Sequence, residues 1–74
     1  MKQKIYVDFN NRDSLGRVRL NTKGTFDDLK RFNIELKPGL ELLLDDEEEL
    51  MASGIVQFSQ EENIWVASFE WINA

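Results

Sequence analysis

The sequence predicts an all-β fold with one short helix, arranged as a small five-stranded SH3-like barrel in the order β-β-α-β-β-β. Three observations lead to this prediction. The chain has 74 residues, of which 42% are hydrophobic, so it can form one small core. Several short segments alternate apolar and polar residues, which is the period of a half-buried strand. These segments recur about every 8–12 residues, as in small barrels and sandwiches. We therefore expect a single barrel domain over residues 1–74.

The first two strands are expected at residues 4–9 and 15–20. In both segments every second residue is apolar, and the residues between the segments are good turn formers. Tyr6 then lies on the outer face of the first strand. Arg17 and Arg19 lie together on the outer face of the second strand and give it a basic surface.

A short helix is expected at residues 26–32. Thr25 is the predicted N-cap, with Asp28 three residues later as in a capping box. Asn33 suits the left-handed position that commonly ends a helix. Because a helix of about two turns is not stable alone in water, it must pack on the sheet.

Residues 40–58 allow two interpretations. The Pro-Gly pair at 38–39 suits the middle of a type II turn. After this turn the leucines follow a two-residue period, which predicts a strand at 40–45, an acidic loop and a strand at 50–58. The alternative is a helix over about residues 40–52, since most residue types there are strong helix formers. We favour the two strands, because a run of five acidic residues fits a solvated loop.

The last hairpin is the most clearly marked element. Residues 55–59 and 64–71 are rich in β-branched and aromatic types. The four residues between them form a short turn, in which Asn63 is able to adopt a positive φ. Gly54 lies inside the first of these strands, where a single glycine often marks a bulge.

The charge is distributed unevenly along the chain. Residues 1–34 contain eight Lys and Arg against four Asp, whereas residues 35–74 contain one Lys against ten Asp and Glu. The simpler interpretation is that strands from the two halves lie together and neutralise one another. The alternative is a dipolar surface that selects a partner by the sign of its charge.

Several kinds of chemistry lack their usual residues. Without cysteine or histidine the chain has no disulfide, no thiolate zinc site and no common general base. We therefore expect no enzyme and no cofactor. The acidic run at 45–49 lacks the glycine and the distal glutamate of an EF-hand loop, so no metal site is expected. The longest apolar run is 42–44, too short for a membrane span or a signal-peptide core, and we expect a cytoplasmic domain.

Two functions from different classes are compatible with these features. The first is a non-enzymatic protein-interaction module, in which Trp71 and Tyr6 form an exposed aromatic groove and Trp65 belongs to the same aromatic row. The alternative for that row is the hydrophobic core. The second function is single-stranded nucleic-acid binding, with Arg17 and Arg19 as phosphate contacts and Tyr6 as a stacking platform. Because the chain is acidic overall, we favour another protein as the partner.

Overall fold

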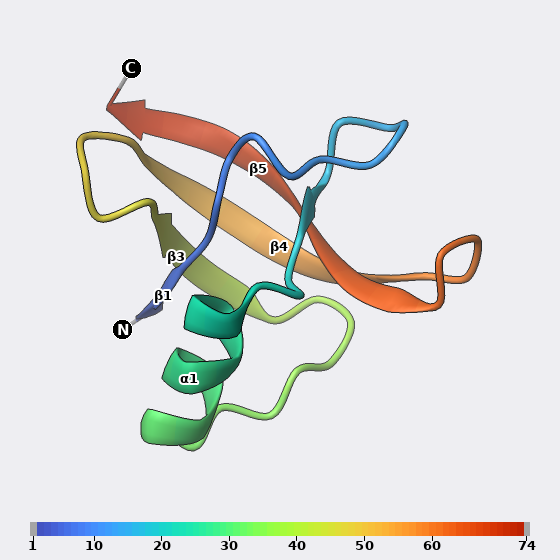
Figure 1. Ribbon diagram of the computed structural model, residues 1–74, viewed down its shortest axis with the longest axis horizontal. Coiled ribbons are helices and arrows are strands. Elements are labelled where there is room, and N and C mark those ends of the chain that lie inside the picture. Colours follow the sequence, from blue (N-terminus) through green and yellow to red (C-terminus); the bar gives the residue numbers. More distant parts are fainter. Residues whose placement is uncertain (1, 74) are drawn as a thin grey trace.

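The computed structural model describes residues 2–73 and shows one five-stranded sheet with a single helix (Figure 1). The sheet order is β1-β3-β4-β5-β2; β1 runs parallel to β3, and the other neighbours are antiparallel. The fold is thus mostly β-sheet with one short helix. The elements follow the predicted order along the chain: β1 (Gln3–Tyr6), β2 (Val18–Arg19), α1 (Lys23–Arg31), β3 (Glu41–Asp45), β4 (Met51–Ser59) and β5 (Ile64–Asn73).

The sheet is open, so the predicted SH3-like barrel is not confirmed. Among residues 2–73, β1 and β2 form the two edges of the sheet, and no ladder joins them. The chain between them crosses one face of the sheet, seen as the blue segment over β5 in Figure 1. It then forms a bridge from Arg12 to Val18 beside β2. We call the crossed face the inner face and the opposite one the outer face.

The hydrophobic core lies against the inner face. Leu42 and Leu44 are buried while Leu43 between them is only partly buried, as the two-residue period predicted. Partly buried residues of α1 and of the following loop pack against this core. Its buried members are Ile5, Val7, Phe9, Val18, Leu20, Leu42, Leu44, Ala52, Val56 and Ala67.

The strands β3 and β4 settle the interpretation of residues 40–58, since no helix forms at 40–52. The first two strands are shorter than predicted. β1 ends at Tyr6, because the chain then leaves the ladder to cross the sheet, although Val7 and Phe9 remain buried. β2 is likewise only two residues long, because a tight turn precedes it.

The predicted N-cap of the helix is wrong by three residues. α1 begins at Lys23, and its N-cap is Thr22, whose Oγ1 accepts a hydrogen bond of 3.2 Å from the Thr25 N–H. Thr25 is instead fully buried and donates its hydroxyl to the Tyr6 carbonyl at 2.7 Å. The Asp28 carboxylate accepts the Tyr6 N–H at 2.8 Å rather than capping the helix.

Helix α1 therefore closes the free edge of β1 at Tyr6. Both backbone polar groups of Tyr6 bond to α1 side chains rather than to a further strand. Gly24 permits this close approach, because a Cβ there would lie 2.6 Å from the Tyr6 ring. Covering an edge in this way blocks pairing with other chains.

The helix end and the turns agree with the sequence. Asn33 has a φ of 55°, and the Ile34 N–H reaches the Leu29 carbonyl at 2.9 Å, which is a Schellman motif. Gly39 has a φ of 88°, as a type II turn requires, and Asn63 has a φ of 59° in the β4–β5 turn.

Gly54 does not mark the bulge. The register shift between β4 and β5 lies at Met51 and Ala52 instead. Gly54 is buried beneath Leu44, and an added Cβ would lie 2.7 Å from Leu44 Cδ1. The glycine is thus needed for close packing of neighbouring strands.

Replacing Thr25 by valine should destabilise the protein, because it leaves the Tyr6 carbonyl without its donor. The loss of a buried hydrogen bond should lower the free energy of unfolding by about 1–3 kcal/mol, as measured in urea. Lys30→Ala, an exposed change on the same helix, should stay within about 0.5 kcal/mol of wild type. Equal stability of Thr25→Val and Lys30→Ala would contradict the role given to this bond.

Candidate functional site

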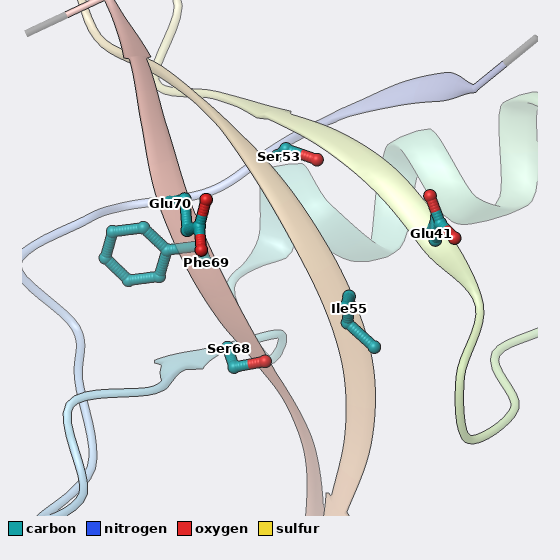
Figure 2. Close-up of a pocket in the computed structure, with 6 residues that line it drawn as sticks. All are labelled: Glu41, Ser53, Ile55, Ser68, Phe69 and Glu70. Carbon is teal, nitrogen blue, oxygen red and sulfur yellow. The ribbon is translucent and has the colours of Figure 1, made fainter.

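The outer face of the sheet carries a shallow polar hollow (Figure 2). Lys2 lies beside it, 2.9 Å from Ser53 Oγ and 3.4 Å from Glu41 Oε1. In Figure 2 the Phe69 ring projects past the edge of β5, so Ile55 is the one apolar side chain among the lining residues that lies over the hollow itself. Such a surface is the solvated face expected of an antiparallel sheet. The hollow is lined by Glu41, Ser53, Ile55, Ser68, Phe69 and Glu70.

A second hollow is mainly apolar, with three aromatic residues in its lining, and has a volume of about 370 Å³. Phe26 is 54% exposed and Phe58 is 39% exposed, although both are large apolar side chains. The Phe58 ring meets the Trp65 ring edge-on, with 5.1 Å between centroids. We call this surface the aromatic hollow; it is lined by Leu20, Asn21, Phe26, Phe58, Asn63, Ile64 and Trp65.

A network of side-chain hydrogen bonds stabilises the rim of the aromatic hollow. The Arg19 guanidinium donates to both oxygens of Glu62, at 2.7 and 2.8 Å, and to Asn11 Oδ1 at 3.2 Å. Asn11 in turn donates to Asn21 Oδ1 at 2.8 Å. The bond from Arg19 lowers the pKa of Glu62, and the same bond raises the pKa of Arg19. Arg19 therefore holds the rim together rather than facing a polyanion.

Arg17 is also engaged by the protein itself. Its Nε donates to Asp13 Oδ2 at 2.8 Å, and its Nη1 donates to Gln57 Oε1 at 3.1 Å. Burial raises the pKa of Asp13, but hydrogen bonds from Arg17 and from the Leu15 N–H outweigh it and hold the pKa below 3.8. Both predicted phosphate contacts, Arg17 and Arg19, are thus paired with carboxylates.

Ion pairs join the two oppositely charged halves of the chain. Three of those in residues 2–73 link a basic residue of the first half to an acid of the second half: Lys2–Glu41, Lys4–Asp45 and Arg19–Glu62. Three more lie within the first half: Asp13–Arg17, Lys23–Asp27 and Asp28–Arg31. Most of the basic residues of the first half are therefore paired with carboxylates of the protein itself.

The structure does not bring Tyr6 and Trp71 together. Tyr6 is on the edge strand β1 against Gly24, whereas Trp71 is on β5, with β3 and β4 between them. Trp71 packs against Phe9 and Phe69 at centroid distances of 4.7 and 5.0 Å. The surface beside Tyr6 contains three carboxylates and one guanidinium, from Asp27, Asp28, Arg31 and Glu47.

The acidic run at 45–49 forms a structured loop. Asp46 Oδ1 accepts the backbone N–H groups of Glu48, Glu49 and Leu50 at 2.9, 3.1 and 3.1 Å, and these bonds, first that of Glu48, lower the pKa of Asp46. Within residues 2–73 no group of three or more His, Cys, Asp or Glu side chains is placed to hold a metal ion. No helix in the same residues has the length and apolarity to cross a membrane.

Of the three aromatic residues that line the aromatic hollow, Phe26 and Phe58 were not predicted as site residues from the sequence. Helix α1 packs on the core through Thr25 and Leu29, and this packing turns Phe26 outward. Phe58 could have been found, because the predicted β4–β5 hairpin places it directly opposite Trp65.

Comparison with known proteins gives no relative. No protein-family model matches the chain, and no curated protein or solved structure matches it either. Function is therefore inferred from the surfaces themselves.

The depressed carboxylate pKa values predict a loss of stability in acid. Asp13, Asp46 and Glu62 have folded pKa values below the ordinary 3.8 of aspartate and 4.5 of glutamate. A lowered folded pKa gives stability that is complete above the unfolded pKa and disappears as the pH falls through the folded pKa. Urea unfolding should therefore show lower stability at about pH 3 than at about pH 7.

The matched variant for this acid effect is Asp13→Asn. It cannot be protonated, so it should be less stable than wild type at neutral pH and lose less stability on acidification. Identical pH dependence of Asp13→Asn and wild type would show that Asp13 contributes nothing to the effect.

Proposed function

We propose that this chain is a small non-enzymatic protein-interaction module that binds another protein through the aromatic hollow. The observation that supports this proposal is the exposure of Phe26 and Phe58 beside Trp65. Exposed apolar patches with a polar rim mark interaction sites, and aromatic residues dominate the binding energy of such sites.

The chemistry of the hollow fits an apolar side chain carried on a polypeptide. The aromatic rings supply a hydrophobic wall that is already held in place by the edge-on contact of Phe58 with Trp65. Asn21 and Asn63 on the rim supply amide groups that can bond to the partner's backbone. A partner would insert an apolar anchor and align its main chain along the rim.

We also propose that the scaffold is an open form of a small SH3-like barrel. The chain that leaves β1 first contacts β3 and then reaches the edge strand β2 on the other side of the sheet. Its Val7 N–H bonds to the Asp45 carbonyl of β3 at 3.1 Å, and its Arg12 pairs with Val18 of β2. The end of β2 and the start of α1 then lie beside the β4–β5 hairpin, and the aromatic hollow is formed where these three segments meet.

Capture of partners from a lysate of the source cell tests the proposed function. A partner retained by the tagged wild-type chain should be lost with Phe26→Ser, because this change removes one wall of the hollow. Phe32→Ser is the matched control, since Phe32 is 45% exposed at the other end of the same helix and lies outside the hollow. Phe32→Ser should retain the partner. Equal capture by Phe26→Ser and Phe32→Ser would rule out the aromatic hollow as the binding site.

A gel-shift experiment tests the alternative of nucleic-acid binding. We expect no shift of single-stranded DNA or RNA by micromolar protein at about 20 mM salt, where the Debye length exceeds about 20 Å and phosphate contacts are strongest. The reason is that Arg17 and Arg19 are already paired with carboxylates. Tight binding that Arg17→Ala or Arg19→Ala abolishes would favour the nucleic-acid function instead.

A further inference from the structure

The turn before β2 presents a leucine at an exposed tip. Leu15 is 74% exposed, more than any other large apolar side chain in the described part of the chain. In Figure 1 this turn, between blue and cyan, projects away from the sheet. A single exposed leucine is common on protein surfaces, so its significance depends on how it is held.

The tip is rigid, because the buried Asp13 carboxylate organises it. Asp13 Oδ1 accepts the Leu15 N–H at 3.0 Å and the Arg17 N–H at 2.9 Å, and Oδ2 accepts Arg17 Nε at 2.8 Å. Gly16 completes the turn with a φ of 80° and donates its N–H to the Asp13 carbonyl at 3.0 Å. A side chain held on such a loop loses little conformational entropy when it binds.

We propose that Leu15 of one copy inserts into the aromatic hollow of a second copy, so that the chain associates with itself. This inference rests on the proposed function, because it names the occupant of the same hollow. The same chain carries both complementary parts: a projecting apolar knob and an apolar hollow.

The charges beside the two parts are also complementary. Arg12 lies at the base of the Leu15 turn; its Nε donates to the Phe9 carbonyl at 2.6 Å, and the residue remains exposed. The exposed Glu61 lies in the β4–β5 turn, which borders the hollow through Asn63. Docking of the knob brings opposite charges together at the rim, and such pairs favour encounter and orientation more than affinity.

The arrangement permits a two-fold dimer. In Figure 1 the Leu15 turn and the β4–β5 turn project from the same side of the molecule. Two copies related by a two-fold axis could therefore exchange knobs, giving two equivalent contacts. Because each contact buries little more than one side chain, the dimer belongs to the weak class of interfaces.

Sedimentation velocity of the full chain tests this inference. At about 0.15 M salt, where the Debye length of about 8 Å screens the net charge, the sedimentation coefficient should rise with concentration up to about 1 mM protein. Leu15→Ser and Phe26→Ser should each remain monomeric over this range. Phe32→Ser should associate like wild type, and circular dichroism should show that all three variants are folded.

Mixing the two defective variants gives the sharper test. Leu15→Ser retains an intact hollow and Phe26→Ser retains an intact knob, so their equimolar mixture should form a one-to-one dimer that neither forms alone. This dimer has one contact instead of two, so it is weaker and should dissociate at a higher protein concentration than the wild-type dimer. Association of Leu15→Ser equal to that of wild type, or a mixture that stays monomeric, would overturn the proposal.

The two proposals can fail separately. A wild-type chain that is monomeric throughout, while Phe26→Ser still loses a captured partner, would overturn self-association and leave the interaction module standing. A captured partner that is insensitive to Phe26→Ser would remove the aromatic hollow from the proposed function, whatever the oligomeric state.

Discussion

The backbone of Tyr6 is the point on which the arrangement of helix and sheet depends. Its N–H and carbonyl both bond to side chains of α1, and its ring lies against Gly24. These contacts fix which side of α1 faces the sheet. Phe26 is consequently turned outward, where it becomes one wall of the aromatic hollow. A polar contact at one edge of the sheet thus positions an apolar surface elsewhere.

Local chemistry allowed much of the fold to be predicted from the sequence. The alternating leucines of β3, the positive φ of Asn33 and the turn at Gly39 each follow from the residue types themselves. The N-cap could not be predicted in the same way, because Thr22 and Thr25 are equally good caps by type. The Thr25 hydroxyl instead donates to the Tyr6 carbonyl, and no local sequence pattern indicates this partner 19 residues away.

The candidate site was less predictable than the fold, for a related physical reason. The sequence around an arginine does not show whether its guanidinium will bind a phosphate of a partner or a carboxylate of the same chain. Arg19 reaches Glu62 across 43 positions of sequence, and Arg17 reaches Gln57 across 40. Exposure of Phe26 and Phe58 is likewise decided by packing. Trp65 was placed in an aromatic row, and it lines the hollow with Phe58, its neighbour on β4.

The parallel pairing of β1 with β3 has a consequence for the order in which the chain assembles. β3, β4 and β5 are successive antiparallel neighbours, so their contacts are local and can form soon after synthesis. β1 is synthesised first, yet its pairing partner appears only after the whole segment from Val7 to Leu40 has been made. During translation the first strand therefore waits with Ile5 unburied until β3 leaves the ribosome. β2 waits longer still, because its partner β5 is the last strand to be made.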